Sequence, residues 1–313
     1  MLSMGISRYK CATVAEAEML ADCQAPHILL AYPLVGPNIE RYLTLIARYP
    51  QSRFYAIGDD AATLRLLSDA AAGKGVVVDT LLDVNLGMNR TGLTVEKALD
   101  VYGLCSRMPG LSLCGLHCYD GHHNDKDFKA RCERVDEAVR DVGLLIRKLE
   151  EQGLSCPIRI MAGTPSFPCH ARHADEYLSP GTCFLMDYGY ATNVPDLPFV
   201  PAAAVLTRVI SHPAEGLFTL DLGYKGIASD PAGLRGVIVN LEEAEPALHS
   251  EEHWVWRMKP GFERLAPPIG SAWYVIPTHI CPTSALYPAA LVAEDHQIVG
   301  EWPITARNRK LTV

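Results

Sequence analysis

The chain has 313 residues, a formal net charge of −8 and a hydrophobic fraction of 49%, an ordinary composition for a soluble globular protein. The acidic balance disfavours nucleic acid or an acidic membrane surface as a partner, and no apolar run reaches membrane-spanning length. Length predicts one large or two moderate domains. Ten cysteines are scattered without a CxxC pair, which predicts mostly buried free thiols in a reducing cytoplasm.

Apolar runs alternate with helical patterns over the first two-thirds of the chain, after a capping box at Thr13-Val14-Ala15-Glu16 that opens the first helix. The predicted strands are 27–33, 53–57, 75–84, 112–119, 158–162 and 177–184. The predicted helices are 38–49, 60–72, 94–108 and 125–152. So many β/α units in series favour a TIM-like β/α barrel over an open sheet.

The pattern changes near residues 192–201, where three prolines occur. Short apolar or alternating runs follow, separated by turns rich in Gly and Pro, and no clear helix is predicted. The predicted strands here are 203–210, 217–222, 237–241, 254–258, 272–276 and 297–302. We therefore expect a β/α domain over residues 1–195 and an all-β domain over residues 196–313.

Two small turns follow late strands of the predicted barrel. They are Ala162-Gly163-Thr164 and Ser179-Pro180-Gly181-Thr182. Turns of this kind expose backbone N–H groups and a hydroxyl, and the loops after adjacent late strands of such barrels commonly bind phosphate. Gly163, Thr164, Gly181 and Thr182 are therefore candidate phosphate ligands, with two ordinary loops as the alternative.

Polar side chains also follow two earlier strands. Arg90 could bind a phenolate or carboxylate, or form a structural ion pair. Tyr119 could stack on a cofactor ring, and His122 or His123 could act as a base or a ligand. An exposed turn followed by a helix capped at Asp125 is the alternative for this second segment.

His279 and Cys281 follow the apolar run 273–276. If the chain stays extended to Cys281, their side chains share one face of a strand. An imidazole and a thiol side by side form half of a zinc site, and an ordinary strand end is the alternative.

Nine segments, in order, resemble the D-threonine aldolase family, which is related to D-serine dehydratases and more distantly to alanine racemases. The likeness runs from about Lys10 to Arg309. It implies a pyridoxal-phosphate-dependent fold of a β/α barrel and a β domain, and a homodimer whose sites combine the barrel of one subunit with the β domain of the other. The segments are KCATVAEAEML, LLAYPLVGPNIER, DVNLGMNRTGL, GLHCYDGHHND, AGTPSFP, SPGTCFLMDYGY, DLGYKGIASD, SEEH and PTHICPT.

The resemblance also implies a role for each candidate residue. Ser179 stands where alanine racemases have an arginine directed at the pyridine nitrogen, which argues against racemase chemistry. The implied metal is zinc, with manganese or magnesium as alternatives. The matches are Gly163, Thr164, Gly181 and Thr182 with the phosphate turns, Arg90 with the arginine near the phenolic oxygen, Tyr119 with the residue on the pyridine ring, His122 and His123 with the loop beside the substrate, and His279 and Cys281 with the metal ligands.

One departure concerns the family's Schiff-base lysine, which lies in a Pro-His-x-Lys-Thr motif before the first matching segment. No such motif occurs in the 313 residues, so we expect a barrel incomplete at its N-terminus and assign Lys10 no such role. The implied reaction is retro-aldol cleavage of D-3-hydroxy amino acids, such as D-threonine to glycine and acetaldehyde. The alternatives are a D-serine dehydratase that releases pyruvate and ammonia, or an inactive form that lacks the cofactor lysine.

Overall fold

The computed structural model describes residues 1–310 and 312–313, and its contacts divide the chain into two units. Unit 1 comprises Met1–Pro180 together with Asn308–Val313, and unit 2 comprises Gly181–Arg307. The short helix α7 (Tyr188–Asn193), which the predicted boundary at residue 195 assigns to the barrel, belongs to unit 2.

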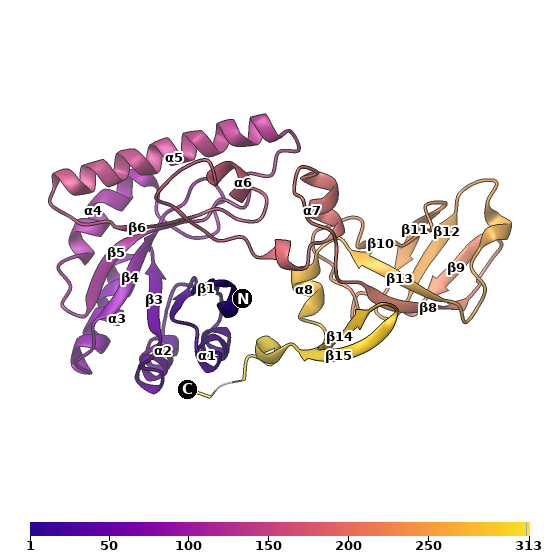
Figure 1. Cartoon of the computed structure of the whole chain (residues 1–313), viewed down its shortest axis with the longest axis horizontal. Coiled ribbons are helices and arrows are strands. Elements are labelled where there is room, and N and C mark those ends of the chain that lie inside the picture. The colour runs from indigo at the N-terminus through magenta and orange to yellow at the C-terminus, as the bar shows by residue number, and fades with distance from the viewer. Residues whose placement is uncertain (311) are drawn as a thin grey trace. The chain divides into compact units, whose positions relative to one another are not determined.

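A seven-stranded parallel sheet, in the order β1 to β7, forms the centre of unit 1. The strands are β1 (Arg8–Cys11), β2 (His27–Leu30), β3 (Arg53–Gly58), β4 (Val78–Asp83), β5 (Leu111–Cys118), β6 (Ile158–Met161) and β7 (Tyr177–Leu178). The connecting helices are α1 (Val14–Asp22), α2 (Pro37–Arg48), α3 (Ala61–Gly73), α4 (Val95–Cys105), α5 (Phe128–Glu151) and the short α6 (Phe167–His170). Helices α1 to α5 cover the outer face of the curled sheet (Figure 1).

The two edge strands of this sheet, β1 and β7, approach each other through side chains. The guanidinium of Arg8 lies 4.7 Å from the ring centroid of Tyr177. Lys10 Nζ donates to the Ser179 hydroxyl at 2.5 Å. The sheet therefore curls far enough to bring its edges together without hydrogen-bonding them as a strand pair, and the predicted incomplete barrel is confirmed.

Both faces of the sheet are buried, as expected for parallel strands. The helix-facing core includes Ile28 and Leu30, whereas Leu29 belongs to a second cluster on the opposite, inner face. Lys10 pairs with Leu29 in the register of β1 and β2, so its side chain shares the inner face. Alternation along β1 thus places an amine inside the partial barrel.

Unit 2 contains a six-stranded antiparallel sheet, in the order β10-β13-β8-β9-β12-β11, and the two-stranded pair β14-β15. Its strands are β8 (Val205–Ser211), β9 (Leu217–Leu220), β10 (Gly236–Ile238), β11 (Ala244–His249), β12 (Trp254–Met258), β13 (Ala272–Pro277), β14 (Ala289–Glu294) and β15 (Gln297–Pro303). Phe218, Trp254, Trp256 and Val275 are almost fully buried in its core. The predicted β domain is confirmed.

Several predicted elements differ from the structure. The predicted strand 177–184 ends at Leu178, because Pro180 lacks the N–H that would continue a strand. Unit 2 contains two short helices, α7 and α8 (Ile280–Ser284), where no helix was predicted. Helix α8 was not predicted because proline usually breaks a helix, but Pro282 lies in the first turn, where a helix tolerates proline. Strand β11 contains Pro246 and lies at the sheet edge, where proline is accepted.

The cysteines are free thiols in the part of the chain that the structure describes, as predicted. Cys114 and Cys118 are buried as expected, whereas Cys183 is half-buried. Burial raises the pKa of Cys114 to about 12, so this thiol stays protonated and inert at neutral pH. Over the described residues, no helix combines the length and apolar character needed to cross a membrane.

Candidate functional site

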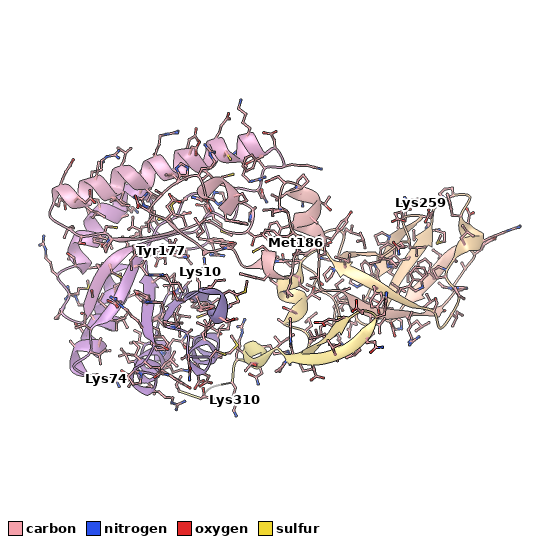
Figure 2. The ribbon with its side chains drawn as sticks, in the orientation of Figure 1. Lys10, Lys74, Tyr177, Met186, Lys259 and Lys310 are labelled. Carbon is pink, nitrogen blue, oxygen red and sulfur yellow. The ribbon has the colours of Figure 1, made fainter. Side chains whose placement is uncertain are left out.

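Four polar residues of unit 1 gather at the carboxyl ends of its parallel strands. Arg90 follows β4, Tyr119 follows β5, Ser179 follows β7, and Lys10 lies near the end of β1. The Tyr119 ring contacts both cations, because the Arg90 guanidinium carbon and Lys10 Nζ each lie 4.7 Å from its centroid, and Ser179 accepts from Lys10. The structure therefore brings the predicted residues Arg90 and Tyr119 together and adds Lys10, which Figure 2 shows beside this sheet.

The Tyr119 hydroxyl packs against two glycines. An added Cβ at Gly163 would lie 2.9 Å from Tyr119 Oη and 3.1 Å from the Cα of Gly121. An added Cβ at Gly121 would also overlap the Tyr119 hydroxyl. Because neither position has room for a side chain, glycine is required to keep the 163–164 turn against the aromatic ring.

The Gly163-Thr164 turn is held from within rather than left open. The Gly163 N–H donates to Ser166 Oγ at 3.0 Å, and that hydroxyl donates to Asp120 Oδ1 at 2.6 Å. Thr164 is only 3% exposed. The expectation that this turn exposes its N–H groups is therefore wrong for Gly163, because the neighbouring serine is its acceptor. The predicted phosphate role of the turn stays a prediction.

Asp120 connects this turn to a buried imidazole. His170 Nε2 lies 2.7 Å from Asp120 Oδ2, and His170 Nδ1 lies 2.8 Å from Glu176 Oε2, with all three side chains fully buried. Burial opposes the charge on His170, but the two carboxylates raise its pKa to about 9. Burial likewise opposes the charge on Asp120, but hydrogen bonds from His123, His170 and Ser166 hold its pKa far below the usual range.

The two predicted histidines lie in contact beside this network. The ring centroids of His122 and His123 are 4.2 Å apart. His123 Nδ1 lies 3.3 Å from Asp120 Oδ2, whereas His122 Nδ1 is buried and has no hydrogen-bond partner among the described residues. Burial and the neighbouring His123 lower the pKa of His122, so His122 is neutral and able to accept a proton near pH 7.

A second Asp–His pair inside unit 1 was not predicted. His117 Nδ1 lies 2.7 Å from Asp83 Oδ1, and Thr91 donates to Asp83 Oδ2 at 2.7 Å. Burial lowers the pKa of His117, and its Nε2 has no hydrogen-bond partner in the part of the chain that the structure describes. The sequence held one indication that His117 faces the site, because His117 and Tyr119 are two residues apart at the end of one strand and therefore share a face.

The predicted metal ligands are in unit 2 with Thr182. The strand before them ends at Pro277, and His279 is the N-cap of α8, so the expected extended geometry up to Cys281 is wrong. The Thr182 hydroxyl lies 3.2 Å from Cys281 Sγ. Gly181 also belongs to unit 2, whereas Gly163 belongs to unit 1.

His279 and Cys281 influence each other's charge. A hydrogen bond to Cys281 raises the pKa of His279, whose Nδ1 also lies 3.1 Å from Asp230 Oδ2. Burial opposes ionisation of Cys281, but hydrogen bonds with His279 and Thr182 lower its pKa. The two shifts favour a thiolate beside an imidazolium, and after loss of the imidazolium proton the pair offers two donors suited to zinc. Within residues 1–310 and 312–313, no group of three or more His, Cys, Asp or Glu side chains is arranged to hold a metal ion.

Asp187 ties α8 to α7 in the same unit. It is 1% exposed, accepts from the Ile280 N–H at 3.1 Å through Oδ2, and accepts from the Tyr190 N–H at 2.9 Å through Oδ1. The predicted strands did not suggest this bridge, because α7 and α8 were both missed. Its effect is to fix the backbone between His279 and Cys281.

Comparisons with known proteins identify the relatives of both units. Residues 1–189 match the family model of the alanine racemase N-terminal domain, and residues 202–293 match that of a serine dehydratase domain. D-threonine aldolase of Arthrobacter sp. is 28% identical over 98% of this chain and 80% of its own length. 3-Hydroxy-D-aspartate aldolase of Paracoccus denitrificans (strain Pd 1222) is 24% identical over 96% of this chain and 78% of its own length.

The fold agrees with these matches. The crystal structure of D-threonine aldolase from Filomicrobium marinum superposes with a TM-score of 0.89 at 27% identity, and it covers 98% of this chain and 83% of its own. The chain therefore belongs to the alanine racemase N-terminal domain family, and it is homologous to D-threonine aldolase and 3-hydroxy-D-aspartate aldolase.

Proposed function

We propose that the chain is a pyridoxal-phosphate- and metal-dependent lyase that cleaves D-3-hydroxy amino acids by a retro-aldol reaction, with D-threonine giving glycine and acetaldehyde. The observation that carries this proposal is the arrangement around Tyr119. Its ring contacts the Arg90 guanidinium, and its hydroxyl packs against the Gly163 turn. An aromatic face, a fixed cation and a tight glycine turn are the parts needed to hold an anionic, phosphate-bearing aromatic ring.

The residues around Tyr119 fit pyridoxal phosphate by their chemistry. Tyr119 would pack against the ring, and Arg90 would hold its phenolic oxygen. Bound there, the cofactor would supply an electron sink for the carbanion left by carbon–carbon cleavage. The proposed phosphate contacts are Gly163, Thr164, Gly181 and Thr182.

Proton transfer falls to the histidine pair. The lowered pKa of His122 keeps its imidazole neutral near pH 7, and His122 Nδ1 has no hydrogen-bond partner within residues 1–310 and 312–313. His122 is therefore suited to accept the proton of the substrate's 3-hydroxyl. His123 contacts His122 and is oriented by Asp120. It would either assist His122 in this proton transfer or accept the proton in its place.

The proposed metal ligands are His279 and Cys281, and zinc suits their imidazole and thiolate donors. A metal there would supply Lewis acidity toward the substrate's hydroxyl oxygen. Asp230 contacts the other side of His279 and would fix its ring orientation. We further propose that the active form is a homodimer.

A D-serine dehydratase is the second candidate, because residues 202–293 match the serine dehydratase domain. The same histidines and metal ligands would serve it, with water lost from the substrate in place of an aldehyde. The products distinguish the two, since a dehydratase releases pyruvate and ammonia, whereas an aldolase releases glycine and an aldehyde.

The test is an assay of the chain with pyridoxal phosphate and zinc or manganese, using D-threonine, 3-hydroxy-D-aspartate and D-serine, with L-threonine as the stereochemical control. Glycine from D-threonine supports the proposal, and Arg90→Ala should lower kcat/KM at least about tenfold by weakening cofactor contacts. Pyruvate from D-serine without glycine from D-threonine would favour the dehydratase. No product from any substrate at full cofactor and metal occupancy would refute both candidates.

A further inference from the structure

We propose that Lys10 is an imine-forming amine, whose Nζ condenses with an aldehyde at the carboxyl ends of the unit 1 strands. This goes beyond the proposed function, which gives Lys10 no part. It also departs from the expectation drawn from the sequence, where the absence of the family's lysine motif left Lys10 without chemistry. The structure adds the surroundings of the Lys10 nitrogen, which the position of the residue in the sequence could not reveal.

The position of Lys10 is the first support. Its register with Leu29 directs the side chain to the inner face of the sheet. There Nζ donates to the Ser179 hydroxyl at 2.5 Å and lies 4.7 Å from the centroid of the Tyr119 ring. The amine thus ends beside a ring and a hydroxyl, and the Arg90 guanidinium contacts the same ring, at the strand ends where catalytic groups of β/α barrels gather.

The charges around Lys10 are the second support. Throughout the described part of the chain, no carboxylate oxygen lies within 4.0 Å of its Nζ, whereas Lys74 Nζ lies 2.9 Å from Glu40 and Lys225 Nζ lies 2.6 Å from Glu251. A lysine without a carboxylate partner in a desolvated position loses much of the reason to stay protonated.

The groups that face Lys10 lower its pKa on balance. Burial acts first and the nearby Arg90 second, while the carboxylates of Asp83 and Asp120 act in the opposite direction, and the result is a pKa of about 8. His117, from β5, is also coupled to Lys10 electrostatically. About a quarter of the Lys10 amine is then neutral near pH 7.5, compared with about one part in a thousand for an ordinary lysine.

The chemistry balances with the aldehyde alone. The neutral Nζ attacks the carbonyl carbon, and a C–N bond forms while one amine proton moves to the carbonyl oxygen. That oxygen then leaves as water with the second amine proton, and a C=N double bond remains. No oxidant or reductant is consumed, and Ser179 can accept a hydrogen bond from the amine before it attacks.

The experiment treats the chain with pyridoxal phosphate as the aldehyde probe, traps imines with borohydride and maps the modified lysines by peptide mass spectrometry. We expect Lys10 to be labelled at least about tenfold faster than Lys74 near pH 7.5, with a pH midpoint near 8. Lys74 is the matched control in the same unit, at a distance from Lys10 in Figure 2.

Lys10→Arg keeps a cation but cannot form an imine, so it should lose the fast label, whereas Lys74→Arg should keep it. Ser179→Ala retains the amine and should still be labelled at Lys10, which guards against misfolding of a single variant. Even labelling of all lysines, or labelling of Lys10 only above a pH of about 10, would overturn the inference. Because this readout needs no substrate, trapping at Lys10 without amino acid cleavage would count against the proposed function alone, and the reverse result against this inference alone.

Discussion

His170 Nε2 lies 2.7 Å from Asp120 Oδ2, and both side chains are fully buried. This contact joins α6 to the end of β5 and leaves the second oxygen of Asp120 to accept from Ser166. Ser166 in turn accepts from the Gly163 N–H. A buried ion pair is thus connected by hydrogen bonds to the Gly163 turn, and it helps to fix where this turn lies relative to the histidine loop.

The first prediction is that His170→Asn destabilises unit 1 by about 3 kcal/mol or more near pH 7, because it leaves the Asp120 and Glu176 carboxylates buried without their shared cation. Urea unfolding of the full chain, followed by far-UV circular dichroism, measures the loss, because the long helices α1 to α5 all belong to unit 1.

His173→Asn is the matched control for this change. His173 lies three residues along the chain, is 26% exposed, and contacts the partly exposed Asp136 at 2.8 Å. A loss below about 1 kcal/mol is expected there, as for exposed ion pairs. Equal losses in the two variants would contradict the importance of the buried pair.

The second prediction concerns pH. The folded pKa of His170, about 9, is raised above its ordinary value, so its contribution is complete below a pH of about 6.5 and is lost as pH rises through about 9. The integrated change is on the order of 3 kcal/mol. Lys10 acts oppositely above a pH of about 8, because its folded pKa is lowered and folding stability rises with pH while the folded form has released the proton that the unfolded form still holds.

The comparison of native protein with His170→Asn isolates the histidine from Lys10. The stability difference between them should shrink between pH values of about 6.5 and 9. A difference that stays constant over this range would mean that His170 is not held as a cation in the folded protein.

Most helices and strands could be predicted from the sequence, because the signals for caps, turns and apolar periodicity are local. The capping box at Thr13 forms as predicted, with the Glu16 N–H donating to Thr13 Oγ1 at 3.1 Å. Apolar runs bounded by turns located strands β2 to β6 to within a few residues, whereas β1 was not predicted and β7 is shorter than predicted. Strand β14 was missed because its sequence, AALVAE, is rich in residues that favour helices.

The candidate site was only partly predictable. Arg90 and Tyr119 follow neighbouring strands, and parallel topology brings such positions together. The link between His170 and Asp120 spans 50 residues of sequence, and it depends on a helix of four residues that no periodicity could indicate. The place of Lys10 in the site could not be predicted, because it depends on which strands form the edges of the curled sheet, and the sequence does not reveal this.

The third prediction is that Ser166→Ala weakens binding of pyridoxal phosphate about tenfold while binding of pyridoxal changes little. Removing the hydroxyl leaves the Gly163 N–H and Asp120 Oδ1 without their partner, which costs about 1–3 kcal/mol and loosens the turn proposed to contact the phosphate. Fluorescence titrations with the two ligands provide the comparison.

Ser52→Ala is the control for Ser166→Ala, because Ser52 is also buried and donates to the Ala25 carbonyl at 2.8 Å. It should reduce stability and leave the ratio of the two affinities unchanged. If Ser166→Ala weakened both ligands equally, the turn would not be acting on the phosphate.

The fourth prediction is that His279→Ala and Cys281→Ala each remove bound zinc. Each variant deletes one of two adjacent donors, and loss of His279 also removes the hydrogen bond that helps to lower the pKa of Cys281. We expect the zinc affinity to fall at least about tenfold in each variant, and by a smaller factor in Asp230→Asn, which only orients His279. Cys23→Ala, at an exposed free thiol of unit 1, should leave the zinc content unchanged. Zinc measured by mass spectrometry after dialysis decides the point, and retention of the metal by both ligand variants would show that these two residues do not hold it.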